Sequence, residues 1–293
     1  MSEVFIHAKD LCYSYKEEGQ LDLPVLRGLS LDICKGEYVA ILGHNGSGKS
    51  TFAKLLNMIL EPDSGELIVA GKNLTSPDLT EDDVYALRRE VGMVFQSPDN
   101  QLVATIVEDD VAFGPENLGV PSAEIRRRVD EALATVGMSD YAKHEPHRLS
   151  GGQTQRVAIA GIIAMMPSCM IFDESTSMLD PHGRREVIET FEKLNREKGI
   201  TVLTITHYMN EAARADRVVV IDDGKILMQG TPAEVFARAD ELRAVGLDVP
   251  QCTQLVHELR AKGVCLAGEP TTAEECAELI YHALEEHHGK RNS

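Results

Sequence analysis

The stretch that decides the fold is Gly43-His44-Asn45-Gly46-Ser47-Gly48-Lys49-Ser50-Thr51. It fits the pattern G-x-x-x-x-G-K-[ST], in which backbone N–H groups of a loop surround a phosphate. An apolar run of strand length, residues 38–42, comes before it, and apolar side chains at helical spacing follow it over residues 52–60. This order of strand, glycine-rich loop and helix predicts a nucleoside-triphosphate site.

Each part of the loop has an expected role. Gly43, Gly46 and Gly48 are expected to take positive φ, so that successive N–H groups approach the phosphate oxygens. The helix that begins near Lys49 should point its free N–H groups at the same anion. Lys49 should reach the β- and γ-phosphates, and the Ser50 hydroxyl should take a Mg²⁺ position. A chance glycine-rich turn is the alternative, and the flanking strand and helix argue against it.

Length and composition restrict the remaining possibilities. The 293 residues can bury a core and form one or two domains. The net charge of −18 argues against a nucleic-acid partner, because phosphate backbones require excess Lys and Arg. The longest apolar run, residues 157–166, is too short for a membrane span, and the N-terminus lacks the pattern of a secretory signal. The six cysteines form no C-x-x-C pair, which favours reduced thiols. We expect a soluble, intracellular chain.

Three polar side chains follow three expected strands. Gln96, Glu174 and His207 each come just after an apolar run of strand length, and Asp173 ends the second run. Ligand groups in an α/β sheet gather at the carboxyl ends of its strands, so we expect all of them at one edge. Asp173 would hold the metal's coordination shell, and Glu174 would polarise the attacking water. Paired acids are often solvated turn residues and a lone histidine is often structural; the phosphate loop and the shared edge favour function here.

A second glycine motif, Leu149-Ser150-Gly151-Gly152-Gln153, comes directly before a helical pattern. Its backbone would lie open at a helix N-terminus, which makes it a second anion site. An ordinary helix cap is the alternative, and the phosphate loop in the same chain argues against it. The motif closes a helical insert, about residues 97–166, in which Ser122 is an expected N-cap.

An aromatic side chain at the end of the first strand, residues 4–15, could stack on a nucleotide base. Tyr15 is the first candidate and Tyr13 the second, and simple packing in the sheet remains an equal alternative. Further strands are expected at residues 29–33, 66–69 and 218–221, the last turning back through Asp223-Gly224. A helix is expected over Pro181–Lys198, and Thr231 and Thr272 should each cap a later helix.

The composition changes near residue 240. Two amphipathic helical patterns without catalytic residues follow, and they predict a small appendix for packing or dimerisation. The expected domains are therefore residues 3–239, with the helical insert, and residues 240–293.

The phosphate loop, residues 149–153, the acids at 173–174 and His207 occur in the order and spacing of ATP-binding cassette ATPases, which the chain resembles over residues 3–239. The resemblance implies an α/β fold: a RecA-like P-loop NTPase core with an antiparallel β subdomain and an inserted helical subdomain. It also implies a head-to-tail dimer in which ATP lies between the phosphate loop of one subunit and residues 149–153 of the other. Tyr15 would stack on adenine, Gln96 would sense Mg²⁺ and the attacking water, and Asp180 would lie at the dimer seam.

Four stretches narrow the resemblance further, because they are similar to those of energy-coupling factor transporter ATPases: residues 43–48, 95–101, 173–181 and 246–250. Thr154 stands where a lysine would be expected. ATPases of this kind power uptake of vitamins and of nickel or cobalt ions. The implied partners are a second ATPase subunit, identical or paralogous, a transmembrane coupling protein and a membrane substrate-binding subunit. The implied location is the cytoplasmic face of the cell membrane.

Other function classes fit the same residues less well. A chromosome- or repair-type ATPase would separate its two nucleotide halves by a long coiled coil, and Lys49 and Asp173 lie too close in the chain for that. A translation factor would carry two cassettes in tandem. A P-loop small-molecule kinase would lack residues 149–153 and His207. The ATPase of a conventional binding-protein-dependent importer remains the rival interpretation.

Overall fold

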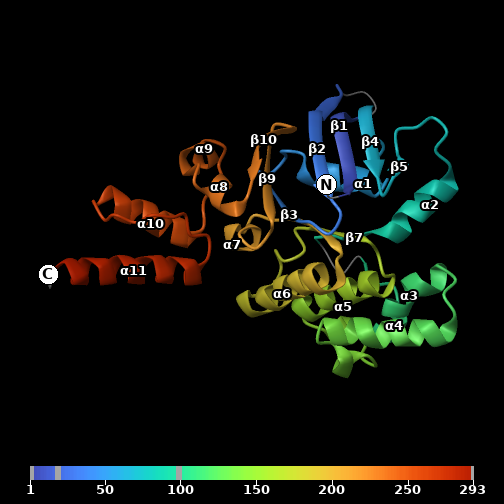
Figure 1. The fold of residues 1–293 in the computed structure, drawn as a ribbon. Helices are drawn as coiled ribbons and strands as arrows, with labels where there is room; N and C mark the ends of the chain where they lie inside the picture. Colours follow the sequence, from blue (N-terminus) through green and yellow to red (C-terminus); the bar gives the residue numbers. More distant parts are fainter. Residues whose placement is uncertain (1–2, 17–20, 97–100, 292–293) are drawn as a thin grey trace.

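Two β-sheets form the body of the protein in a computed structural model that describes residues 3–16, 21–96 and 101–291 (Figure 1). The larger sheet is parallel except for one edge strand, which returns through a hairpin as expected. In spatial order its strands are β10 (Lys225–Gly230), β9 (Arg217–Asp222), β3 (Tyr38–Leu42), β8 (Thr201–Ile205), β7 (Cys169–Asp173) and β6 (Val91–Val94).

The smaller sheet is antiparallel, as expected for the β subdomain. Its strands, in spatial order, are β2 (Leu23–Cys34), β1 (Val4–Tyr15), β4 (Ser64–Val69) and β5 (Lys72–Asn73). β2 begins earlier than the expected start at Leu29 and includes Pro24. Proline is tolerated there because β2 is an edge strand and Pro24 lies at its beginning.

Apart from its edge strand β10, the larger sheet is buried on both faces, and its residues alternate between two cores. Along β3, Val39 and Ile41 join the core beneath the smaller sheet, while Ala40 and Leu42 join the core beneath the helices. Helix α1 (Lys49–Leu56) buries Phe52 in the first core. The second core is covered by α3 (Val107–Asn117), α4 (Ser122–Thr135), α5 (Gly151–Ala164) and α6 (Pro181–Lys198). Figure 1 shows these four helices on the side of the body opposite β1, β2 and β4.

Helices α3, α4 and α5 lie in the segment expected to be a helical insert; its bounds stay a prediction, and residues 97–100 lie outside the described residues. The short 3₁₀ helices η2 (Ser139–Tyr141) and η3 (Pro146–Arg148) connect α4 to α5. The prediction that Ser122 is an N-cap was wrong. Pro121 holds the extended cap position, with φ −61° and ψ 141°, and Ser122 is already the first helical residue.

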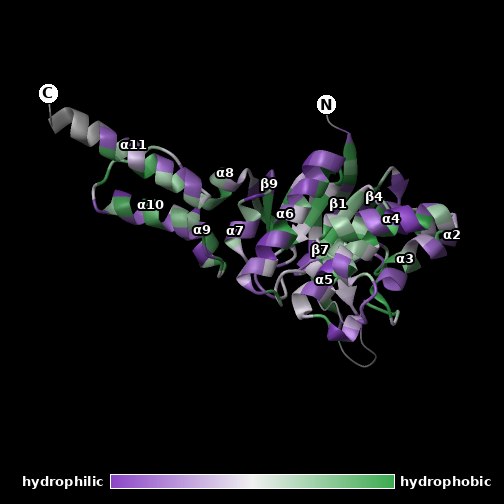
Figure 2. Cartoon of the chain, turned by 90° about the horizontal axis from the view of Figure 1, so that it is seen from below, coloured by the Kyte–Doolittle hydropathy of each residue, from purple (hydrophilic) through white to green (hydrophobic). Residues whose placement is uncertain are grey.

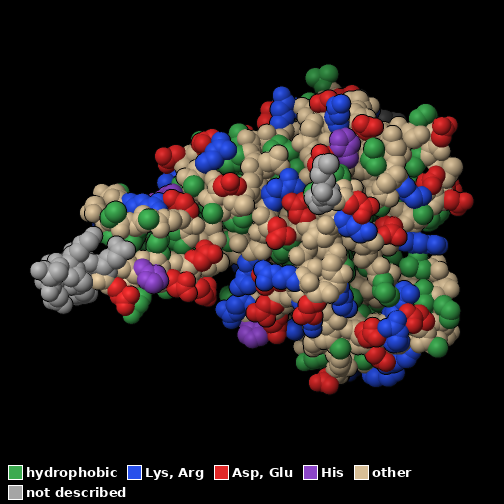
Figure 3. All heavy atoms as spheres, viewed as in Figure 1, with side chains coloured by type: hydrophobic (Ala, Val, Ile, Leu, Met, Phe, Trp, Pro, Cys, Tyr) green, Lys and Arg blue, Asp and Glu red, His purple; other side chains and the backbone are tan. Residues whose placement is uncertain are grey.

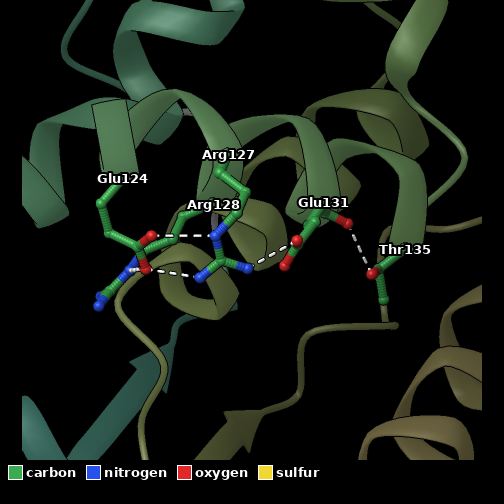
Figure 4. A network of polar contacts seen from close by, with 5 residues as sticks. All are labelled: Glu124, Arg127, Arg128, Glu131 and Thr135. Carbon is green, nitrogen blue, oxygen red and sulfur yellow. Dashed lines mark hydrogen bonds and ion pairs between the residues drawn. The ribbon is translucent and has the colours of Figure 1, made fainter. Parts of the chain in front are cut away.

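The outer face of α4 carries a chain of ion pairs (Figure 4). Glu124 accepts hydrogen bonds from Arg127 and Arg128, and Arg127 also reaches Glu131 at 2.7 Å. These partners lie three or four residues apart, the spacing at which helical side chains meet. Because solvent screens such pairs, they contribute little to stability and mark a solvated surface.

Helix α2 (Glu81–Glu90) was not predicted from the sequence. Thr80 caps it, since Asp83 N donates to Thr80 Oγ1 at 3.2 Å while the Asp83 carboxylate accepts from Thr80 N. Only Leu87 is buried, so the helix lacks the apolar stripe on which periodicity depends.

The C-terminal segments begin with α7 (Met209–Ala212), α8 (Pro232–Phe236) and α9 (Ala239–Ala244), followed by α10 (Gln251–Ala261) and α11 (Ala273–Arg291). Thr231 and Thr272 cap helices as predicted. Figure 2 shows α10 and α11 lying side by side and projecting from the body. They share a small core around Val256 and Cys276, whereas Leu247 and Val249 belong to the main core. We therefore propose that the appendix separates from the nucleotide-binding unit near Pro250.

The surface mixes both signs of charge. Acidic and basic side chains alternate over the face drawn in Figure 3. Among the helices that the structure describes, none is both long enough and apolar enough to cross a bilayer.

Candidate nucleotide-binding site

The phosphate loop runs from the end of β3 to the start of α1. Gly46 and Gly48 have φ of +84° and +107°, and Gly48 is the N-cap of α1. Gly43 does not take positive φ, which corrects the prediction for this residue. It is required for space: a Cβ there would lie 2.3 Å from Ile221 O and 2.5 Å from Ser47 Oγ.

The hairpin between β9 and β10 supports this loop from outside. Asp223 and Gly224, at its turn, have φ of +45° and +75°. Gly224 N donates to Ser47 O at 3.1 Å, and Gly224 O accepts from Arg27 N at 3.1 Å. A Cβ on Gly224 would lie 2.2 Å from Val25 O. This one residue therefore joins the smaller sheet to the phosphate loop.

Lys49 lies in the hollow of the loop. Its Nζ donates to Gly43 O and to His44 O, both at 2.9 Å, and the residue is 4% exposed. Burial lowers the pKa of the ammonium below its ordinary value, and the charges of Glu174 and Asp173 oppose that shift. A cation is thus fixed beside the N-terminus of α1, where an anion would be bound.

The tip of the loop is more exposed. His44 Nε2 lies 3.0 Å from Asp222 Oδ1, and its Nδ1 lies 2.8 Å from Asn45 O. These contacts engage both ring nitrogens of His44. His44, Asn45 and Gly46 remain open to solvent.

The two residues expected at the metal meet directly. Ser50 Oγ donates to Asp173 Oδ1 at 2.8 Å, although the residues are far apart in the sequence. Asp173 is 7% exposed; burial raises the pKa of its carboxyl, and the Ser50 hydroxyl opposes that effect. A hydroxyl and a carboxylate are oxygen ligands, which Mg²⁺ prefers, so the residues present fit this ion.

The three polar strand ends also come together, as predicted. Gln96 Nε2 donates to Glu174 Oε2 at 3.1 Å, and His207 Nε2 lies 2.6 Å from Glu174 Oε1. Glu174 has a φ of +49°, a strained value for a residue with a Cβ. Its backbone N–H donates to Ile205 O at 3.0 Å, which holds the residue between β7 and β8.

Tyr15 is the aromatic residue that reaches the phosphate loop. Its hydroxyl lies 3.3 Å from Thr51 Oγ1, and the residue is partly exposed. Tyr13 packs edge-on against it, with ring centroids 5.0 Å apart, and also lies against the core beneath the smaller sheet. This geometry favours Tyr15 over Tyr13 as a stacking surface.

Residues 149–153 open helix α5, as predicted. Ser150 Oγ accepts from Gln153 N at 3.4 Å, and Gln153 Oε1 accepts from Ser150 N at 2.9 Å. A Cβ at Gly151 would meet nothing within 4 Å, and one at Gly152 would meet Leu179 Cδ2 at 3.6 Å, an ordinary contact. This subunit's own fold therefore does not require either glycine. Among the described residues, no hydrogen bond or ion pair joins the motif to the phosphate loop.

Asp180 is exposed and caps α6. Its Oδ1 accepts from Gly183 N at 2.7 Å. Within one subunit this side chain has a structural role, and its place at a dimer seam stays a prediction.

Sequence reasoning missed Glu211. This acid in α7 is 2% exposed and accepts hydrogen bonds from Thr176 and Thr206. It was missed because an acid in a short polar segment usually faces solvent. The available signal was a pair of threonines near the expected catalytic residues: Thr206 directly precedes His207, and Thr176 comes two residues after Glu174.

Comparison with known proteins agrees with this geometry. Residues 26–177 match the protein-family model described as ABC transporter. An "Energy-coupling factor transporter ATP-binding protein EcfA1" of Clostridium novyi is 52% identical over 96% of this chain and 99% of its own length. A protein of the same name from Caldanaerobacter subterraneus is 53% identical over 94% of this chain and 98% of its own.

Solved structures give the same result. The cbiO1 protein of Clostridium perfringens, described as part of the ABC transporter complex cbiONQ, aligns with a TM-score of 0.75 and 37% identity over 88% of this chain and 99% of its own. The ATP-binding cassette MJ0796, solved as a dimer in a post-hydrolysis state with ADP and Pi, aligns with a TM-score of 0.71 and 31% identity over 78% of this chain and 98% of its own.

Proposed function

The chain belongs to the ATP-binding cassette transporter ATPases, among the energy-coupling factor ATP-binding proteins that hydrolyse ATP to drive transport, and from this we propose that it powers uptake of a vitamin or a nickel- or cobalt-type micronutrient at the cytoplasmic face of the cell membrane. One observation supports ATP hydrolysis most directly. The side chains of Gln96 and His207 both contact Glu174, next to the hydrogen-bonded pair of Ser50 and Asp173.

The roles of the residues follow from their positions. Lys49 would exchange its two loop carbonyls for the β- and γ-phosphate oxygens. Ser50 and Asp173 would hold Mg²⁺, which when bound neutralises phosphate charge and orients the transferred group. Glu174 would accept a proton from the attacking water, since the other carboxylate at this strand edge, Asp173, is paired with Ser50 at the expected Mg²⁺ position. Gln96 and His207 each contact one carboxylate oxygen of Glu174 and so fix the orientation of that side chain.

We also propose that residues 149–153 complete the site of a second ATPase subunit. Gly151 and Gly152 leave open space at the start of a 14-residue helix, and among the residues that the structure describes, none lies so close that it would exclude a Cβ. A helix N-terminus presented in this way binds anions. The dimer in which MJ0796 was solved is consistent with a pair of such subunits.

The transmembrane coupling protein would dock on the helical insert. A cleft of about 560 Å³ lies there, lined by Leu102, Ala104, Thr105, Ile106, Glu145, Pro146, His147 and Thr154. Val103 beside it is 64% exposed, and its N–H donates to Asp110 Oδ1 at 2.7 Å. Gln101 links this segment to the site, because its amide accepts from Phe95 N and donates to Met93 O. Asn100, another expected contact, lies outside the described residues.

The test is isolation of the chain from membranes with its partners attached. An energy-coupling factor ATPase should co-purify with one general coupling protein and a second, similar ATPase. A conventional importer would instead yield a dedicated pair of permeases. Recovery of the wild-type chain without any membrane protein would refute the transport role.

A further inference from the structure

Glu211 is a buried acid that lies behind the catalytic pair. Its Oε1 accepts from Thr176 Oγ1 at 2.7 Å, and its Oε2 accepts from Thr206 Oγ1 at 2.5 Å. Arg184 Nε lies 3.5 Å from Oε1, so a cation from α6 faces the same carboxylate. The two threonines come from different loops, one after β7 and one after β8.

The threonines lie next to the residues that matter for hydrolysis. Thr206 directly precedes His207, and its hydroxyl also accepts from Tyr208 N at 3.0 Å, so the residues on either side of His207 are hydrogen-bonded to each other. Thr176 comes two residues after Glu174, in the loop where Ser177 N donates to Glu174 O. Each oxygen of Glu211 therefore holds one of the two loops.

Arg184 extends the same connection. Its guanidinium carbon lies 3.4 Å from the centroid of the Tyr208 ring, and its Nη2 donates to Leu179 O at 3.3 Å. It thus contacts the loop of His207 and the far end of the loop of Glu174. Glu211 and Arg184 together join both loops to α6 and α7.

We propose that Glu211 is a positioning residue for ATP hydrolysis, which holds the loop of Glu174 and the loop of His207 in register so that the two side chains meet. The inference rests on the proposed roles of Glu174 and His207. Glu211 does not touch the site itself and acts through Thr176 and Thr206.

The burial of the Glu211 carboxyl beside Arg184 argues that this acid has a function. Burial raises the pKa of Glu211 above its ordinary value, with the two threonine hydroxyls and Arg184 opposing the shift, so the folded chain keeps an acid where its charge is unfavourable. A carboxylate can accept from both threonines at once, whereas the Gln amide has one acceptor oxygen and would have to donate to the second hydroxyl, which reverses that hydrogen bond and takes the acceptor away from its O–H. Glu211→Gln should therefore weaken the connection to one loop without leaving a cavity.

The test uses the full chain purified with its partner subunits and measures kcat, KM for ATP and thermal unfolding. Glu211→Gln and Thr206→Val should each lower kcat by about tenfold or more, with KM changed by less than about twofold, because the phosphate loop is untouched. Thr206→Ser, which keeps the hydroxyl, is the matched control and should retain nearly wild-type kcat.

A double-mutant cycle separates positioning from general support. In a His207→Ala background, Glu211→Gln should cost less than about twofold, because the contact between His207 and Glu174 that Glu211 holds in place is then absent. If the effects of the two substitutions on kcat are fully additive, the inference is wrong. It is also wrong if Glu211→Gln leaves kcat unchanged while His207→Ala alone lowers it. If His207→Ala itself keeps wild-type kcat, the proposed role of His207 fails as well. Should Glu211→Gln not fold, equal kcat in Thr206→Val and Thr206→Ser would overturn the inference.

Discussion

Replacing Gly151 or Gly152 by alanine should stabilise the free subunit and yet impair the enzyme. Both residues lie in the first turn of α5, neither has positive φ, and a Cβ meets at most one ordinary contact. Gly to Ala at such a position stabilises by about 0.4–1 kcal/mol, chiefly by restricting the unfolded chain. For a chain of this size that corresponds to a rise in Tm of about 1–4 °C.

ATP hydrolysis should respond in the opposite direction. If the start of α5 faces the phosphates bound by a second subunit, a methyl group there would separate them from the helix N–H groups. Loss of an oriented donor of this kind costs about tenfold or more in kcat. Gly161→Ala is the matched control, because Gly161 lies within the same helix and its Cβ would also meet nothing within 4 Å.

The two measurements are thermal unfolding without nucleotide and steady-state ATPase activity with the partner subunits present. Gly161→Ala should raise Tm and keep full activity. Full activity in the Gly151 and Gly152 variants would contradict a shared site, since the open space would then have no ligand. Unfolding of these variants at a lower temperature than the wild type would show that the subunit itself requires the glycines.

Four further outcomes are expected. Glu174→Gln should bind ATP and remain dimeric while kcat falls about 10²–10⁴-fold, whereas Lys49→Ala should lose nucleotide affinity; equal loss of binding in both would contradict these roles. Mixing Lys49→Ala subunits with Gly152→Asp subunits should restore activity, because one composite site then carries neither defect; proven heterodimers without activity would exclude a shared site. Asp173→Asn should raise the Tm of the nucleotide-free chain at neutral pH, since burial raises the pKa of this carboxyl and makes its charged form costly; the gain should shrink as the pH falls and disappear below about pH 3.9, the ordinary pKa of an unfolded Asp, where the carboxyl is protonated in both states. Val103→Glu should release the ATPase from membranes and spare nucleotide binding; a variant that still co-purifies with a transporter active in uptake would place the docking site elsewhere.

The sequence predicted those parts of the site that depend on the edge of a parallel sheet. Gln96, Glu174 and His207 were expected together because each follows a buried strand, and parallel strands align their carboxyl ends. The bounds of α6 were also predicted correctly. Asp180 and Pro181 mark its beginning, and Gly199 ends it with a φ of +66°.

What the sequence did not predict depends on neighbours distant in the chain. Gly43 is glycine because of Ile221, a residue of another strand, so the local motif suggested the wrong reason for it. The burial of Glu211 depends on two loops that meet only in the folded sheet. Ser122, which follows Pro121, was expected as a cap, whereas the helix already includes Ser122 and the extended ψ of 141° falls at Pro121.

The turn between β9 and β10 has a consequence for engineering this chain. Hairpin tips are ordinarily the places where an inserted tag or reporter domain is tolerated. Here Gly224 packs against Val25 and donates a hydrogen bond to Ser47 O. An insertion would therefore separate the smaller sheet from the phosphate loop and should abolish nucleotide binding. The connection between α10 and α11 is the better choice, because residues 261–265 are exposed and these two helices project from the body (Figure 2). A fluorescent reporter placed there could follow the ATPase in cells while the site continues to turn over.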